Sequence, residues 1–324
     1  MCCLFGIMNY SGKANRDTDE IINSLAQEAT IRGIDSTGVA YNKGGKLTIY
    51  KKPLSAYEMT FKGMKECAAV IGHTRHATQG THEKNYNNHP FMGYCKNTKF
   101  ALAHNGVLWN DSFLRRQYSL PNDRIETDSF IAVQLLEHFN ELNFRNIAKM
   151  CELVSGSFTF SMVDTKDNLW IAKGDNPLAL IHFPHLKLYA YASTQQILFT
   201  ALCRTDLVDE IASGDFEMVT IKAGDILKID KRGNMEKQRF KYDLYSGYGY
   251  DWKTYKATDK ATEDDFYTCD DYNDDYSDGN WNEANYLEEL KTVAQCMGIS
   301  PSEIDELIES GFTYDEIEDY IYMG

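Results

Sequence analysis

Short apolar runs, each bounded by turn residues, recur along residues 2–240 of the chain. Runs of this length with such boundaries predict buried β-strands. They lie at Leu4–Met8, Ala69–Ile71, Phe100–Ala103, Phe158–Val163, Leu178–Ile181 and Met218–Ile221.

Helical periodicity, with apolar residues recurring every three or four positions, occurs at two places. The first comprises Ile21, Ile22, Leu25 and Ala29, and the second comprises Phe130, Val133, Leu135 and Leu136. The order of early strands, two helices and a second set of strands predicts an α+β architecture and not a doubly wound parallel sheet.

The pattern changes near residue 241. Residues 241–283 are rich in Tyr, Asp, Gly and Asn, so burial there would offset too little of the chain entropy lost on folding. We interpret this segment as an acidic flexible linker. A calcium-binding loop is excluded, because the required Gly and downstream Glu are absent at the necessary offsets.

Amphipathic periodicity returns in residues 284–324 and predicts three short helices. The first would end at Gly298. Capping boxes at Ser300–Glu303 and Thr313–Glu316 would begin the other two, with Pro301 at a first helical position. We predict a small three-helix bundle, similar to ubiquitin-associated bundles, that acts as a docking module.

The charge of the chain is concentrated in this C-terminal part. Residues 258–324 contain 20 of the 48 acidic residues but only two of the 33 lysines and arginines, Lys260 and Lys291. Such a segment repels nucleic acid, whereas the rest of the chain is nearly neutral. We therefore expect no nucleic-acid partner.

The hydrophobic content of 43% is typical of a globular protein. No run approaches the roughly 18 apolar residues of a membrane span. The apolar N-terminus, Met1–Ile7, has no basic leader and is too short for a signal sequence. These features predict a cytoplasmic protein without a membrane partner.

The position of Cys2 sets it apart from the other seven cysteines, which are scattered and form no Cys-x-x-Cys pair. Removal of Met1 would leave Cys2 with a free α-amine, whose pKa of about 8 lets it act as a base at neutral pH. One residue would then supply both nucleophile and base. The alternative, a buried structural thiol, is the commoner use of cysteine.

Cys2 is followed by a series of short motifs in a fixed order. They are Cys2–Ile7, Arg32–Gly38, Gly72–Thr78, Asn88–Pro90, His104–Gly106 and Glu126–Asp128, with Ser155–Phe158, Lys173–Leu178 and Ala223–Ile226 further on. The series resembles the glutaminase domain of class II glutamine amidotransferases, most closely that of glucosamine-6-phosphate synthase. The resemblance spans residues 2–235 and implies the four-layer αββα sandwich of N-terminal-nucleophile (Ntn) hydrolases.

This resemblance also implies a role for each site residue. Cys2 would attack the side-chain amide of glutamine, and Asn105 with the Gly106 amide would stabilise the oxyanion. Arg75, assisted by Thr78, would bind the substrate carboxylate, and Asp128 its ammonium group. Arg32 and His89 would support the site, without a metal or other cofactor.

Simpler interpretations of the same residues remain open. Arg75 and Asp128 could form a surface ion pair, and Asn105-Gly106 could be a hairpin turn. The histidine-rich segment (His73, His76, His82, His89 and His104) matches no metal-binding spacing.

The chain also departs from the family pattern at three positions. Cys3 replaces the usual Gly, and His76 and Gln79 stand where the synthase has Trp and His. Cys3 adds a side chain beside the nucleophile, which could crowd the pocket. His76 and Gln79 lie in the loop that closes over glutamine, where the Trp of the family helps to gate ammonia transfer.

Three functions remain possible at this stage. The first is a glutaminase that passes ammonia to a separate synthase, since the chain has no recognisable acceptor domain. The second is a stand-alone hydrolase of γ-glutamyl amides, and the third is a non-catalytic regulatory protein. The oligomeric state is not predicted.

Overall fold

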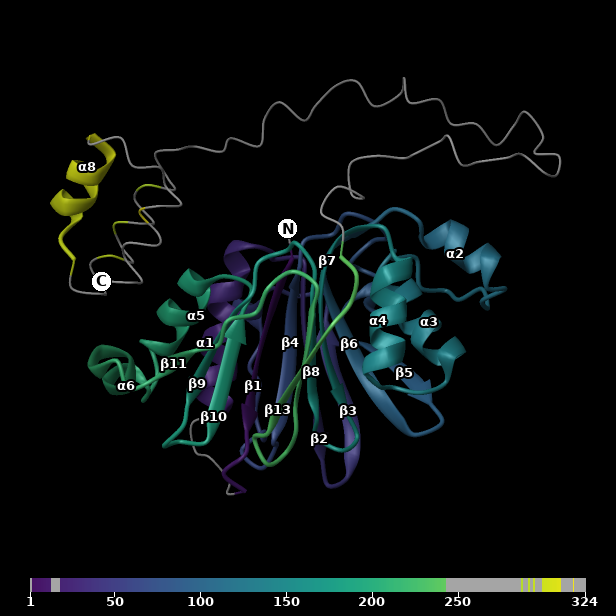
Figure 1. The fold of residues 1–324 in the computed structure, drawn as a ribbon, viewed down its shortest axis with the longest axis horizontal. Coiled ribbons are helices and arrows are strands. Elements are labelled where there is room, and N and C mark those ends of the chain that lie inside the picture. The colour runs from purple at the N-terminus through teal and green to yellow at the C-terminus, as the bar shows by residue number, and fades with distance from the viewer. Residues whose placement is uncertain are drawn as a thin grey trace. The chain divides into compact units, whose positions relative to one another are not determined.

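The computed structural model describes residues 2–12, 18–242, 287, 291, 294, 299–309 and 317. The chain divides into two compact units, residues 1–249 and 250–324 (Figure 1). The larger unit contains two antiparallel β-sheets with helices on their outer faces.

The first sheet has the strand order β11-β9-β10-β1-β4-β2-β3. Its strands are β1 (Cys3–Asn9), β2 (Ser36–Lys43), β3 (Lys46–Lys52), β4 (Ala69–Arg75), β9 (Ala179–Phe183), β10 (Leu188–Ala192) and β11 (Glu217–Met218). Helices α1 (Thr18–Glu28) and α5 (Gln195–Leu202) pack on this sheet and on each other, and α6 (Val208–Ser213) follows α5.

The second sheet has the order β13-β12-β8-β7-β6-β5. Its strands are β5 (Phe91–Cys95), β6 (Thr98–Leu108), β7 (Gly156–Asp164), β8 (Leu169–Lys173), β12 (Asp225–Ile229) and β13 (Met235–Arg239). Helices α3 (Phe130–Phe139) and α4 (Phe144–Leu153) cover it, and α2 (Asp111–Gln117) precedes them. The layers therefore follow the order helix, sheet, sheet, helix, and the predicted αββα sandwich is confirmed (Figure 1).

Two apolar clusters hold the layers together. Leu4, Met8 and Ile71 of the first sheet pack against Ala103 and Ile171 of the second. A separate cluster joins the second sheet to α3 and α4. Strand β1 is buried along its whole length, which explains why its sequence is a continuous apolar run instead of an alternating one.

Five of the six predicted strand segments are strands in the structure. The sixth prediction, Met218–Ile221, is wrong beyond Met218, where β11 ends. Val219 and Ile221 are irregular chain that is partly buried against the inter-sheet core, and the Val219 amide still donates to the Leu180 carbonyl of β9 at 2.8 Å. Both predicted helices are present, as α1 and α3.

The smaller unit is described only in part. Helix α8 (Pro301–Glu309) begins at the predicted Pro301, and the Glu303 amide donates to Ser300 Oγ at 3.3 Å. Ala294, Ile304 and Ile317 form a small buried cluster. The second capping box, Gly298 and residues 243–283 of the expected linker lie outside the described residues.

Candidate active site

Strand β1 begins and strand β4 ends at the same end of the sandwich, beside the N-terminus (Figure 1). Antiparallel pairing of Cys3 with Thr74 brings Cys2 next to the chain that leaves β4. The Cys2 thiol is partly buried and donates a hydrogen bond to the His76 carbonyl, with an S–O distance of 3.5 Å.

Two residues of the loop before β2 hold this region in place. Arg32 Nε donates to the Cys2 carbonyl at 3.0 Å. Asp35 Oδ2 accepts from the Ala77 amide at 2.7 Å. Both contacts join backbone segments around the thiol, so the structure supports a bracing role for Arg32.

Arg75 is buried at the last position of β4, with 3% of its surface exposed. Its Nη1 donates to Asn88 Oδ1 at 2.8 Å, and its Nη2 donates to the carbonyls of Gln79 (2.6 Å) and Gly80 (2.8 Å). The surface ion pair considered from the sequence is wrong, because Arg75 and Asp128 are both buried.

Asn105 and Gly106 lie within β6, opposite Thr159 and Phe158 of β7. The hairpin-turn interpretation is therefore wrong. Gly106 has φ of +140°, and a Cβ there would lie 1.9 Å from the Ser157 carbonyl oxygen. Only glycine fits this backbone conformation and this close approach.

Ser193, which the sequence analysis did not single out, links the two sheets at the site. Its buried hydroxyl accepts from the Leu4 amide at 2.8 Å and from Asn105 Nδ2 at 3.4 Å. Ser193 thus links the Asn105 side chain to β1, the strand that follows Cys2. No motif marks this serine, since its role depends on the pairing of β10 with β1.

Asp128 lies just before α3, with 4% of its surface exposed. Its Oδ2 accepts from the Leu108 amide at 2.6 Å, and its Oδ1 accepts from the Ser129 hydroxyl at 3.3 Å. These bonds hold the Asp128 carboxylate beside Leu108, which lies two residues beyond Gly106 in β6.

The charges of Arg75 and Asp128 both act on the pKa of the Cys2 thiol. Burial has the largest effect on the Cys2 thiol and raises its pKa, while the chain terminus and Arg75 oppose that rise and Asp128 adds to it. Burial also raises the pKa of Cys3, which is fully enclosed. The accessibility of the two thiols therefore favours Cys2 as the nucleophile.

His89 is buried between two other aromatic rings. Its ring centroid lies 4.2 Å from that of His73 and 4.4 Å from that of Phe91. Burial lowers the pKa of His73 to about 3 and that of His89 well below its usual value, so both rings are neutral. Within the described residues no group of acidic, His or Cys side chains has the geometry of a metal site, and no helix is long and apolar enough to cross a bilayer.

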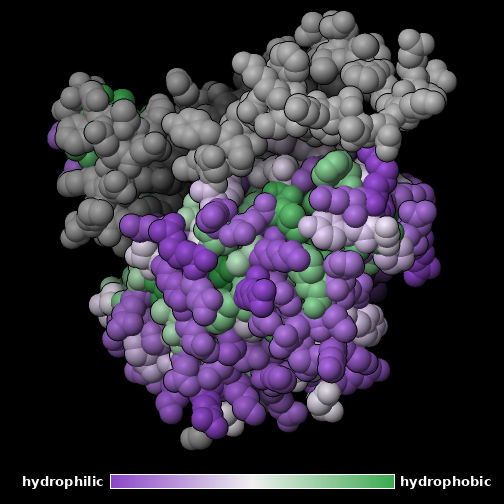
Figure 2. Space-filling view, turned by 45° about the vertical axis from the view of Figure 1, so that its right-hand side comes forward, coloured by the Kyte–Doolittle hydropathy of each residue, from purple (hydrophilic) through white to green (hydrophobic). Residues whose placement is uncertain are grey.

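Thr78 lies exposed in the loop after β4, close in sequence to Arg75. The large exposed hydrophobic side chains of the larger unit include Ile31, Ile34, Val107, Trp109 and Phe113. Figure 2 shows one face of the molecule that is mostly hydrophilic, with hydrophobic side chains gathered towards its upper part.

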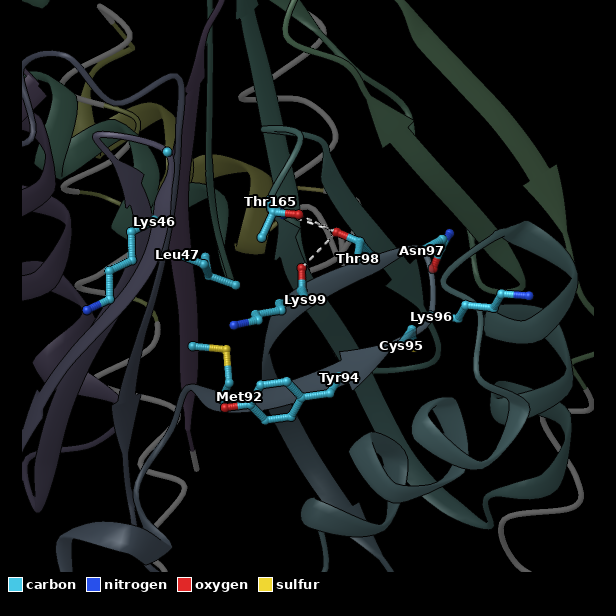
Figure 3. A pocket seen from close by; sticks show the side chains of 11 residues that line it. Lys46, Leu47, Met92, Tyr94, Cys95, Lys96, Asn97, Thr98, Lys99 and Thr165 are labelled. Atoms are coloured by element: carbon cyan, nitrogen blue, oxygen red, sulfur yellow. Dashed lines mark hydrogen bonds between the residues drawn. The ribbon is translucent and has the colours of Figure 1, made fainter.

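A groove at the hairpin turns β2–β3 and β5–β6 has a volume of about 530 Å³ and contains none of the candidate residues. Lys46 and Lys99 lie on its walls, whereas Lys96 points away (Figure 3). Because its cationic groups do not converge on one point, the groove offers no comparable site for chemistry.

Comparison with known sequences identifies one matching family. Residues 1–163 match the family described as class-II glutamine amidotransferases. The glutamine–fructose-6-phosphate aminotransferase (isomerizing) of Staphylococcus aureus strain Mu50 is 29% identical over 245 residues, which cover 71% of this chain and 38% of the relative. The enzyme of the same name from Halalkalibacterium halodurans is 32% identical over 188 residues, which cover 53% of this chain and 29% of the relative. The chain thus spans well under half of these relatives.

Two solved structures share the fold. A glutamine phosphoribosylpyrophosphate amidotransferase from Bacillus subtilis has a TM-score of 0.57 at 22% identity, and a structure titled as the allosteric regulatory enzyme of purine biosynthesis has a TM-score of 0.60 at 21% identity. Each match covers 75% of this chain and 50% of the other.

Proposed function

Because this chain belongs to the class-II glutamine amidotransferases, we propose that it hydrolyses the side-chain amide of glutamine through Cys2. One observation carries the proposal. A partly exposed thiol lies at the start of a central strand, within electrostatic reach of a buried guanidinium, Arg75, and a buried carboxylate, Asp128. A free α-amino acid presents the two complementary charges.

Before any turnover, removal of Met1 from the chain frees the Cys2 α-amine. This amine takes the thiol proton, and the sulfur attacks the amide carbon of glutamine. Asn105 Nδ2 and the Gly106 amide donate to the oxyanion that forms. Collapse with protonation of the leaving nitrogen releases ammonia and leaves a γ-glutamyl thioester, which water hydrolyses to glutamate and free thiol.

Substrate recognition depends on the two buried charges. Arg75 binds the α-carboxylate and Asp128 the α-ammonium, with Thr78 next to the carboxylate end. Their burial supports this assignment, because a charge pair in a protein interior is screened far less than one at the surface. A ligand that pairs with both charges would therefore bind more tightly than a ligand that pairs with only one of them.

An electrophilic glutamine analogue with a diazoketone in place of the amide tests this function. We expect one covalent adduct, on a Cys2 that is the first residue of the mature chain, and protection by excess glutamine. Untreated protein should release glutamate and ammonia in equal amounts. Full activity with Met1 attached would refute the mechanism, and much faster turnover of γ-glutamyl conjugates than of glutamine would favour the stand-alone hydrolase.

We further propose that ammonia passes to a separate synthase, and that the acidic residues 243–324 dock onto it. The concentration of acidic residues in this region supports binding to a basic surface, with affinity that falls as salt rises.

Truncation after Tyr242 tests the docking role. The tyrosine is retained because its ring lies 5.7 Å from that of Phe158 in the core. We expect the truncated chain to hydrolyse glutamine at the normal rate and to lose salt-sensitive binding to the synthase. As a control, full-length protein with Asp270, Asp271, Asp274 and Asp275 changed to Asn should bind with a weaker salt dependence. Loss of glutaminase activity on truncation would show that the segment is part of the catalytic unit.

A further inference from the structure

Lys51 is an unusual lysine, because its ammonium group is turned inward from β3 and away from solvent. Its Nζ donates to the carbonyls of Asn88 and Pro90, the latter at 3.0 Å, and lies 4.8 Å from the centre of the Phe91 ring. Burial and the nearby Arg75 and Arg124 lower its pKa to about 7. Both the amine and the ammonium form carry enough N–H groups for these two bonds.

The segment that Lys51 holds is also the one that orients Arg75. Asn88 Oδ1 accepts from Arg75 Nη1 at 2.8 Å, while Asn88 Nδ2 donates to the His82 carbonyl at 2.8 Å and to Asn85 Oδ1 at 3.3 Å. Asn85 Nδ2 in turn donates to the Lys51 carbonyl at 2.9 Å. Lys51, Asn85, Asn88 and Arg75 thus form one connected network.

Backbone packing makes this network rigid. Gly38 of β2 pairs with Lys51, and a Cβ at Gly38 would lie 2.3 Å from the His89 carbonyl oxygen and 2.6 Å from Lys51 Cβ. The 88–90 segment is therefore pressed directly onto β2 and β3. A shift of this segment towards β2 is blocked by the Gly38 backbone, and its Asn88 and Pro90 carbonyls are held by Lys51 Nζ.

We propose that Lys51 is a positioning residue for substrate binding: by fixing residues 88–90 it holds the Asn88 side chain that sets the direction of the Arg75 guanidinium. The inference rests on the proposed role of Arg75 in binding the carboxylate of glutamine. Lys51 acts through Asn88 and does not itself reach the reacting atoms. A lysine that only stabilised the loop would change the folded fraction and not the affinity of the folded protein.

Substitution of Lys51 by Met, which keeps the length of the side chain but removes its donors, tests the proposal. We expect KM for glutamine to rise about tenfold with kcat within about twofold, since the misplaced guanidinium weakens binding before the chemical step. Lys51→Arg should recover most of the affinity because it supplies two donors. Lys52→Met is the matched control, since Lys52 is the exposed neighbour in the same strand and lies over the Tyr50 ring.

A double substitution separates positioning from general stability. If Lys51 acts through Asn88, Lys51→Met combined with Asn88→Ala should raise KM no more than Asn88→Ala alone. The dissociation constant of glutamate, measured calorimetrically on the same proteins, should follow KM, and thermal unfolding gives the folded fraction.

Three outcomes would overturn the inference: an unchanged KM in Lys51→Met, equal changes in Lys51→Met and Lys52→Met, or fully additive effects with Asn88→Ala. If the unmodified protein neither hydrolyses glutamine nor binds glutamate, the proposed function itself fails, and the role of Lys51 fails with it.

Discussion

Replacement of Cys2 by alanine is expected to lower glutamine turnover by a factor of about 10⁴ or more, because it removes the sulfur atom that we propose forms the thioester. The fold should be unaffected. Cys2 precedes β1, and its backbone carbonyl keeps the bond from Arg32 whatever the side chain. Release of ammonia, measured on the purified variant beside the parent protein, checks this.

Cys3→Ala is the matched control, one residue away and with the same change of side chain. Cys3 is fully buried, so the control should cost some stability and leave turnover near normal. If Cys3→Ala is the inactive variant and Cys2→Ala is active, the nucleophile has been assigned to the wrong thiol.

Asn105→Ala is expected to lower kcat about 100- to 1,000-fold with little change in KM. Its amide would donate to an oxyanion that exists only after attack, so its loss weakens the transition state more than the bound substrate. Ser193→Ala serves as the control, because it removes the 3.4 Å bond to Asn105 but leaves the amide donor in place. A pure KM effect in Asn105→Ala would contradict the assigned role.

The substrate-binding residues should show the opposite kinetic pattern. In Arg75→Lys and Asp128→Asn we expect KM to rise more than kcat falls. Each of these side chains would already bind the α-amino acid in the ground state, so its loss weakens substrate binding before the chemical step. Steady-state kinetics on these variants and on Asn105→Ala, measured together, therefore separate binding from transition-state stabilisation.

The sequence predicted those elements of the larger unit whose signals are local. Continuous apolar runs marked β1, β4, β6 and β7, and glycines mark places where the backbone allows no side chain. The family resemblance drawn from the ordered motifs is confirmed by the match over residues 1–163. The roles given to individual residues stay predictions.

Other features could not be predicted because they depend on strands that are distant in the sequence. Ser193 meets Leu4 and Asn105 only when β10 pairs with β1 and the two sheets face each other. From the sequence, Lys51 is indistinguishable from its exposed neighbour Lys52, and its inward direction follows from its bond to the carbonyl of Pro90 in the 88–90 segment. Helix α4 could have been predicted from its N-cap residue Asn143, but only three of its residues, Ile147, Met150 and Cys151, form its buried apolar face.

The bonds of Arg75 to the carbonyls of Gln79 and Gly80 carry a thermodynamic consequence. A substrate carboxylate that accepts hydrogen bonds from Arg75 Nη2 must compete with those two carbonyls. Binding of the carboxylate and the conformation of residues 76–80 are therefore linked equilibria. Linkage is reciprocal: a partner chain that binds the released form of this loop raises the affinity for the ligand, and the ligand raises the affinity for that partner by the same factor. His76 and Gln79 are exposed positions of this loop, so a change of sequence there can alter affinity through the conformation of the loop.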